Sequence, residues 1–367
     1  MIIFQTPWTA RGWLWMISAF KQVVCLYDNV MEYCAGKGNG DAFPFRILIM
    51  KLVFVSIIIS LFLPGLSMGW QAQCRCADIQ ERGHINVLTL NLLYSENIER
   101  EARFTTVVSF LAQQAIQGEP VDVILLQEVV GGILSGTQNS SQDLKHMLAE
   151  QGLSYNLRYC PVNNQIGILS EGIAILSRCR FLFTVAKTLP TVWETPSEGF
   201  DFPLKRRAVM GRIQVPGVGN LNIFNTHLCA FCDGTERLAQ GKALLKFVSD
   251  VERLIFWDNA PVILGGDLNM DLETSKGQQI HDSIVVAGFE DTYTAFNACE
   301  TCCSVQEGYE GCTYGVSGNP YTDDLPVRID YVFVKHLKVL QSIVVFNDDP
   351  DWVSDHSGVL TKLAVSE

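Results

Sequence analysis

The segment PVILGGDLNMD, residues 261–271, combines a short apolar run with a polar ending. Pro261 to Leu264 are apolar and are bounded by a proline and two glycines, which is typical of a fully buried strand. Asp267 and Asn269 follow directly, so a carboxylate and an amide stand at the carboxyl end of this strand. A buried strand ordinarily ends in a plain turn, and these two side chains therefore indicate a polar site at its end.

Other apolar runs also end in side chains that can bind a metal or move a proton. They are Asn91 in TLNLLY, Glu128 after VILLQ, His227 in NIFNTHL, Asp330 in VRIDYVFV, and Asp355 and His356 in VSDHSGV. Singly, each has an ordinary explanation, such as a turn asparagine, a core histidine or an aspartate that caps a helix. Burial without partners would cost about 2–7 kcal/mol for each neutral polar group. The groups are therefore either solvated one by one or gathered together, and their number favours one common site.

The rest of the chain alternates apolar runs with turns and amphipathic segments. Strands are expected at 84–94, 121–129, 171–178, 181–189, 208–215, 220–228, 327–334, 338–346 and 357–365, beside the one that begins at 261. Helices are expected at about 95–117, 140–152 and 235–256. The close spacing of strands between 171 and 228 is typical of an antiparallel sheet. No repeat or linker divides this region, so the sequence predicts one domain over 84–366, with two stacked sheets flanked by helices.

The polar strand ends and their flanking residues resemble the endonuclease/exonuclease/phosphatase superfamily. The matching elements, in the order of the family, are LNLLY, LLQEV, NTHL, GGDLNM, RIDYVFV and SDHSGV. The resemblance spans residues 84–366 and implies an α/β fold, the deoxyribonuclease-I-like four-layer α/β/β/α sandwich. Within the superfamily, GGDLNM and PVRIDYVFV look most like neutral sphingomyelinases, and THL and DFPLKRRAV fit the same branch.

The resemblance implies hydrolysis of a phosphodiester with Mg²⁺ as the cofactor, by in-line attack of a positioned water. A hard divalent cation prefers oxygen ligands, and the predicted metal ligands are Glu128, with Asn91 beside it through its amide oxygen, and Asp355. His356 is the predicted general base, because an imidazole can accept a proton near neutral pH. Asp330 is expected to orient this imidazole and to stabilise its charged form.

Three further residues complete the predicted catalytic set. Asp267 is expected to position the attacking water or to carry a proton. Asn269 and His227 are expected to bind the substrate, by hydrogen bonds to the non-bridging phosphate oxygens where negative charge develops.

The amino-terminal region differs in character from the rest. Residues 50–72 begin with Met50 and Lys51, continue through an apolar core, and reach Pro64 and small residues. This pattern predicts a signal peptide or a weak membrane anchor. Residues 1–49 lie upstream of a good start at Met50 and are interpreted as an extension from an over-extended start site.

The cysteines are informative about the compartment. Ten of the twelve follow the predicted signal, and an even number there favours disulfide bonds in a secreted or extracytoplasmic protein. The alternative, zinc bound by CAFC and CETCC, is disfavoured because the histidines supply no second ligand pair. The segment CETCCSVQEGYEGC, residues 299–312, is either a disulfide-stapled hairpin that shapes the substrate groove or a stabilised loop.

Charge and aromatic content bear on the substrate. The net charge is −12 and no long basic stripe interleaves with aromatics, so nucleic acid is the less favoured partner. Trp193, Phe200 and Phe202 precede the basic residues 205–207. Aromatics at a loop tip with cations behind them suit a phospholipid surface, although these rings could also pack under their own loop.

The sequence therefore predicts a secreted, Mg²⁺-dependent sphingomyelinase-type phospholipase C that acts at a membrane surface and implies no obligate protein partner. One alternative is a secreted nuclease of the same fold. Others are an inositol-phosphate or other phosphomonoester hydrolase, because the scaffold hosts several activities, and an inactive binding module. The inactive module is disfavoured because no expected catalytic position is missing.

Overall fold

The computed structural model describes residues 76–94, 99–133, 135, 139–165, 169–197, 200–255, 259–299, 302–304 and 309–365. The chain divides into two units at Ala72 and Gln73, and the described residues all belong to the second unit. The predicted upstream extension and signal peptide lie outside the described residues. No helix among the described residues is long and apolar enough to cross a membrane.

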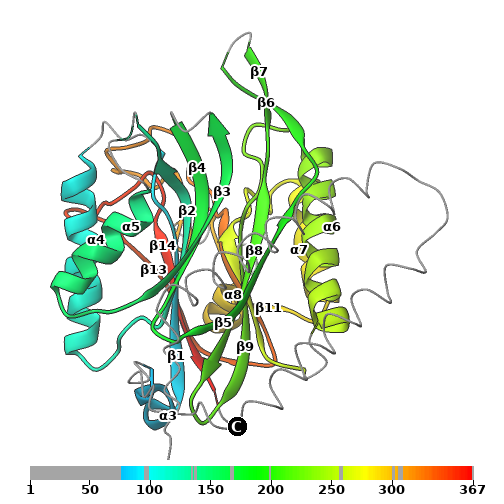
Figure 1. Cartoon of the computed structure of the whole chain (residues 1–367). Helices are drawn as coiled ribbons and strands as arrows, with labels where there is room; N and C mark the ends of the chain where they lie inside the picture. Colours follow the sequence, from blue (N-terminus) through cyan, green and yellow to red (C-terminus); the bar gives the residue numbers. More distant parts are fainter. Residues whose placement is uncertain are drawn as a thin grey trace, which may run out of the picture. The chain divides into compact units, whose positions relative to one another are not determined.

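Two six-stranded sheets form the centre of the second unit (Figure 1). The first has the order β13–β14–β1–β2–β4–β3 and the second the order β11–β12–β10–β9–β8–β5. The first sheet contains β1 (His84–Asn91), β2 (Val123–Gly131), β3 (Asn156–Gln165), β4 (Leu169–Ser177), β13 (Lys338–Val345) and β14 (Gly358–Ala364). The second contains β5 (Phe181–Thr188), β8 (Arg207–Val215), β9 (Gly219–His227), β10 (Val262–Asp267), β11 (Glu290–Asp291) and β12 (Asp330–Lys335).

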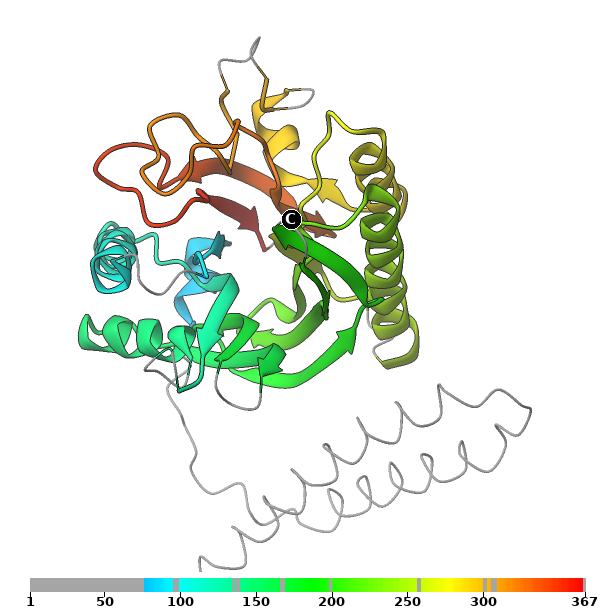
Figure 2. The ribbon, with the colours of Figure 1, turned by 90° about the horizontal axis from the view of Figure 1, so that it is seen from above.

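Helices cover the outer face of each sheet (Figures 1 and 2). The first sheet is covered by α4 (Arg100–Ile116) and α5 (Ser140–Glu150), and the second by α6 (Gly234–Asp250) and α7 (Ser275–Val286). Short elements are α3 (Asp78–Arg82), the π-helical turn η1 (Val251–Ile255) and α8 (Thr292–Asn297). The predicted four-layer α/β/β/α sandwich is thus confirmed.

The strands are apolar on both faces because each face meets another layer. In β1, Ile85 packs between the two sheets, whereas Leu88 packs in the cluster that lies under α4 and α5. In β10, Ile263 packs between the sheets and Leu264 lies in the cluster under α6 and α7. Burial on both faces explains why these strands appear in the sequence as continuous apolar runs rather than as alternating ones.

The positions that face the opposite sheet change from apolar to polar toward one end of the sandwich. These inward series are Ile85, Val87, Thr89 and Asn91 in β1, Ile223, Asn225 and His227 in β9, Ile263, Gly265 and Asp267 in β10, and Val334, Val332 and Asp330 in β12. Since β12 is antiparallel to β10, it starts where β10 ends, and Asp267 pairs with both His227 and Asp330. The two-residue period of a strand therefore brings these side chains to the same interior edge.

Several predicted elements differ from the observed ones. The strands between 171 and 228 do not form one sheet, because β4 belongs to the first sheet and β5 to the second. The crossover is fixed by a disulfide between Cys179 and Cys76, the latter upstream of the predicted domain start. The helix expected to begin near 95 starts at Arg100, and that expected over 235–256 gives way to η1 after Asp250.

A hairpin that the sequence did not predict extends beyond the sheets (Figure 1). It consists of β6 (Val192–Ser197) and β7 (Phe200–Leu204). The hairpin joins the end of β5 to the start of β8, beside Thr226, so it rises at the edge where the polar series converge. The side chains of Trp193, Phe200 and Phe202 lie outside the described residues.

Candidate active site

His356 lies between two aspartates at the polar edge. Its Nδ1 is 2.8 Å from Asp330 Oδ2, and its Nε2 is 3.8 Å from Asp267 Oδ2. All three residues are at most 4% exposed. The short contact to Asp330 fixes the orientation of the ring and directs its other nitrogen toward Asp267.

The protonation of this group follows from its surroundings. Burial would lower the pKa of His356, but the carboxylates of Asp330 and Asp267 outweigh burial and raise the pKa well above its ordinary value. Burial, with the nearby charge of Asp330, raises the pKa of Asp267 to about 7. The imidazole is therefore charged near neutral pH, and Asp267 is poised to exchange a proton there.

The position of Asp267 is set by the glycine before it and by the turn that follows it. Gly266 has a φ of +132°, and a Cβ at this position would lie 2.0 Å from the carbonyl oxygen of Thr226. Only glycine allows β10 to approach β9 this closely. Beyond the strand, Asp267 Oδ1 accepts the backbone N–H of Asn269 at 2.9 Å, which folds the chain into a turn. The Asn269 amide donates one N–H to the Leu228 carbonyl at 3.1 Å and keeps a second N–H for a ligand.

His227 is buried at the same edge and is neutral. Burial and the neighbouring charges of Arg206 and His356 lower the pKa of His227 well below its ordinary value. Its Nε2 lies 3.3 Å from Asp267 Oδ2, and its Nδ1 lies 3.3 Å from Arg206 Nη1. A neutral ring satisfies both contacts if Nδ1 accepts from Arg206 and Nε2–H donates to Asp267.

Arg206 and Glu171 are site residues that the sequence did not identify. Arg206 is 4% exposed and contacts Glu171 at 3.3 Å, and the same carboxylate lies 3.8 Å from His227 Nδ1. Glu171 opens the predicted strand 171–178, and Arg206 stands in the basic run before β8. A charged residue beside a long apolar run was the available signal, but it is too common to single out either one.

A β-bulge in β2 directs the side chain of Glu128 into the site. The pairing of β2 with β4 shifts register between Leu126 and Val129, and Glu128 has a left-handed φ of +53°. Such a bulge turns a side chain that would otherwise face the helices. Glu128 Oε1 accepts a hydrogen bond from Asn91 Nδ2 at 3.1 Å. Burial, and then the charges of Asp355 and Glu171, raise the pKa of Glu128.

Asn91 lies between Glu128 and Asp267 and contacts both carboxylates. Its Nδ2 lies 3.1 Å from Asp267 Oδ2 as well as 3.1 Å from Glu128 Oε1, while its Oδ1 accepts the backbone N–H of Leu93 at 3.0 Å. The nitrogen of the amide thus faces the carboxylates, whereas the predicted ligand role uses the oxygen. Asn91 therefore needs a rotated amide to serve as a metal ligand.

The residues present fit a divalent cation. Glu128 and Asp355 are close enough for the charge of Asp355 to raise the pKa of Glu128, and a bound cation would offset this repulsion. Ligand atoms of Asp267, Asp330 and His356 also lie within 4.8 Å of one another. In that second group the imidazole is engaged by Asp330, whereas Glu128, Asp355 and Asn91 offer the oxygen atoms that a hard divalent cation prefers.

A buried arginine connects the two segments that carry Asn91 and Asp355. Arg103 on α4 is 2% exposed, and its Nη1 donates to the carbonyl oxygens of Leu92 at 2.7 Å and Val353 at 2.9 Å. Leu92 directly follows Asn91, and Val353 stands two residues before Asp355.

We expect Arg103→Met to lower the free energy of unfolding by about 2–5 kcal/mol, because two buried carbonyls lose their donor. We also expect a weaker apparent affinity for Mg²⁺, since the two ligand segments lose their common anchor. Chemical denaturation and a Mg²⁺ titration of activity measure the two effects. Arg158→Met, at an exposed arginine on β3, is the matched control and should change neither.

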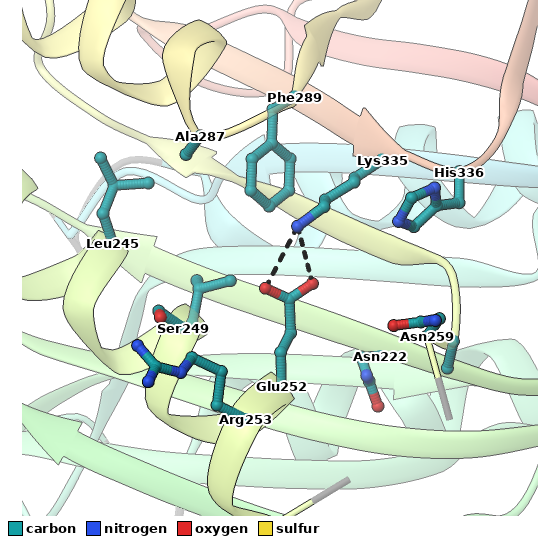
Figure 3. A pocket seen from close by; sticks show the side chains of 12 residues that line it. Asn222, Leu245, Ser249, Glu252, Arg253, Asn259, Ala287, Phe289, Lys335 and His336 are labelled. Atoms are coloured by element: carbon teal, nitrogen blue, oxygen red, sulfur yellow. Dashed lines mark hydrogen bonds and ion pairs between the residues drawn. The ribbon is translucent and has the colours of Figure 1, made fainter. Parts of the chain in front are cut away.

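A cavity of about 430 Å³ lies away from this site (Figure 3). Its lining includes the ion pair of Glu252 and Lys335, in which Nζ and Oε1 are 3.1 Å apart. Lys335 pairs with Val262, at the end of β10 opposite to Asp267. The cavity contains none of the predicted catalytic residues, and the catalytic group stands at the other end of the same strands.

Disulfides join eight cysteines of the described region. The bonds are Cys76–Cys179, Cys229–Cys232, Cys299–Cys302 and Cys303–Cys312. The prediction of disulfides is confirmed for these residues, and CAFC and CETCC do not bind zinc in this arrangement. Four disulfides indicate an extracytoplasmic protein.

The sandwich and its edge of paired acids and imidazoles define a phosphoester hydrolase. The chain belongs to the Endonuclease/Exonuclease/phosphatase family, whose model matches residues 88–356. This confirms the superfamily resemblance seen in the sequence. No curated protein matches the chain.

Solved structures share the fold at low sequence identity. An endonuclease/exonuclease/phosphatase family protein from Leptotrichia buccalis is 23% identical, with a TM-score of 0.55 over 76% of this chain and 99% of that one. A mannosyl-6-phosphatase from Bacteroides thetaiotaomicron is 21% identical, with a TM-score of 0.51 over 76% and 99%. The human Nocturnin catalytic domain with bound sulfate is 16% identical, with a TM-score of 0.52 over 77% and 94%.

Proposed function

We propose that this chain is a secreted, Mg²⁺-dependent sphingomyelinase-type phospholipase C that hydrolyses sphingomyelin to phosphocholine and ceramide. The observation that carries the hydrolytic chemistry is the convergence of Asp267, His356 and Glu128 at one interior edge of the two sheets. A water held there would meet a proton acceptor, a charged imidazole and a cluster of metal ligands.

The choice of a lipid substrate has separate support. GGDLNM and PVRIDYVFV look most like the neutral sphingomyelinase branch, and the net charge of −12 disfavours a polyanionic substrate. The β6–β7 hairpin, whose sequence carries Trp193 and Phe200, rises beside the site and suits contact with a phospholipid surface. The disulfides support secretion.

In the proposed mechanism the attacking water gives its proton to Asp267, whose pKa of about 7 suits a general base. His356, predicted from the sequence as the base, is charged in this geometry and instead stabilises the developing negative charge, while Asp330 holds its ring. His227 and the second N–H of Asn269 donate to non-bridging oxygens. Glu128, Asp355 and Asn91 would hold Mg²⁺, which would supply positive charge that offsets the negative charge on the phosphate and the leaving oxygen.

The test is a substrate panel for the chain produced under conditions that form disulfides. Sphingomyelin vesicles, duplex DNA and an inositol phosphate are offered in parallel, each with Mg²⁺ and with a chelator. We expect Mg²⁺-dependent release of phosphocholine, and no release by a His356→Ala variant. Cleavage of DNA or release of inorganic phosphate with the same dependence would keep the site and replace the lipid substrate. A wild-type chain inactive on all three would refute the proposal.

A further inference from the structure

The cysteine-rich segment leads directly into the active site. The disulfide Cys303–Cys312 closes immediately before Thr313, and both of its cysteines are buried. Gly311 has a φ of +83°, and a Cβ there would lie 2.2 Å from the Cys302 carbonyl oxygen. Gly311 therefore lies tightly against Cys302 just before the chain enters the sandwich.

Thr313 connects the start of β12, where Asp330 lies, with the residues just before β14, where His356 lies. Its Oγ1 accepts the backbone N–H groups of Ile329 and Asp330, each at 3.1 Å, and its carbonyl accepts the N–H of Ser357 at 2.6 Å. Thr313 is completely buried. Thr313, directly after the cysteine-rich segment, thus fixes the start of β12, which carries Asp330, and the residue that follows His356.

Tyr314, the next residue, covers the imidazole. Its ring centroid is 4.8 Å from that of His356, with the planes tilted by 51°. Its backbone bridges to both Val327 and His356, and its hydroxyl donates to Asp324. The tyrosine is half-buried and is held at both ends, by the backbone on one side and by the hydroxyl on the other.

We propose that Tyr314 is a positioning residue for the proposed phosphoester hydrolysis, on which this inference rests. Asp330 fixes Nδ1 of His356 but leaves the ring free to tilt about that contact. The tyrosine ring limits this tilt and keeps Nε2 directed at Asp267. The cysteine-rich segment, which the sequence leaves as either a groove-shaping hairpin or a stabilised loop, therefore leads directly into the two residues that hold Asp330 and His356 in place.

The kinetic test compares Tyr314→Ala, Tyr314→Phe and Tyr309→Ala in the full chain, with a soluble chromogenic phosphodiester and saturating Mg²⁺. Tyr309 is a matched control, because it lies five residues before Tyr314 in the cysteine-rich segment and is 43% exposed. We expect Tyr314→Ala to lower kcat about tenfold, the upper effect of one aromatic contact, while KM changes less than about twofold. Tyr314→Phe retains the ring and should stay within about twofold of wild type. A wild-type kcat for Tyr314→Ala, or equal losses for Ala and Phe, would overturn the proposal.

A second measurement does not depend on turnover. The ring proton signals of His356, assigned by their loss in His356→Gln, should carry a ring-current shift from the tyrosine. Tyr314→Ala should move these signals, while Tyr314→Phe and Tyr309→Ala should leave them near their wild-type positions. If the wild-type chain hydrolyses no phosphodiester, the proposed function fails while this measurement still decides the contact. Unmoved His356 signals in Tyr314→Ala would refute the positioning role.

Discussion

Asp267→Asn is expected to lower kcat/KM for the phosphodiester by about 10²–10⁴-fold, the range that a general base contributes. The amide keeps the shape of the side chain and can still contact Asn269, but it cannot accept a proton from water. Initial rates over a range of substrate concentrations measure the loss. Asp271→Asn, at an aspartate four residues further on, is the control and should remain within about twofold of wild type. Near-wild-type activity of the Asp267→Asn variant would show that Asp267 is not the general base.

The pH dependence gives the same residue a second test. Asp267 has a pKa of about 7 in the folded chain, against an ordinary value of 3.8, so kcat/KM should rise with pH until about 7. The free energy of unfolding changes with pH in the opposite direction to kcat/KM. Between about pH 4 and 7 the folded state holds a proton that the unfolded state has released, so this contribution to the free energy of unfolding is lost as pH rises. Asp267→Asn should weaken both dependences.

Glu128→Gln is expected to abolish activation by Mg²⁺ and to lower activity roughly 10³-fold at a concentration that saturates the wild type, because metal assistance supplies several kcal/mol. Titration of activity with Mg²⁺ measures this change. Glu252→Gln is the matched control, because Glu252 pairs with Lys335 at the other end of the second sheet. A wild-type Mg²⁺ response in Glu128→Gln would exclude Glu128 as a ligand.

Thermal unfolding of Glu128→Gln provides a readout independent of catalysis. Burial and the charges of Asp355 and Glu171 raise the pKa of Glu128, so its ionised form destabilises the metal-free chain near neutral pH. The neutral glutamine should therefore leave Tm unchanged or higher without metal. Added Mg²⁺ should raise the Tm of the wild type but not that of the variant, because only a ligand that binds the folded state stabilises it.

The fold and much of the site could be predicted because polar residues interrupt otherwise apolar strands. His227, Asp267 and Asp330 stand at such interruptions, and the structure places them side by side through strand register. Arg206 and Glu171 could not be found in this way, because each lies beside an apolar run instead of interrupting it. Their role depends on contacts between β4 and the start of β8, which only the folded chain brings together.

The elements that the sequence did not reveal have weak local patterns. In α7 only Gly277, Ile280 and Ile284 are buried, which leaves too few apolar positions for a clear helical period. Strand β3 contains Pro161 and several polar residues, and proline is tolerated there because β3 lies at the edge of the first sheet. The change of sheet between β4 and β5 depends on packing between layers, which strand spacing alone does not encode.

The bulge in β2 places a constraint on the length of the chain as well as on its composition. Deleting one residue from 126–129 would let β2 and β4 pair without the register shift, and it would leave a single position facing the second sheet where Gln127 and Glu128 now stand. Inserting a residue there would shift everything beyond it to the opposite face. Related chains that use the same site should therefore tolerate substitutions in this segment far better than insertions or deletions.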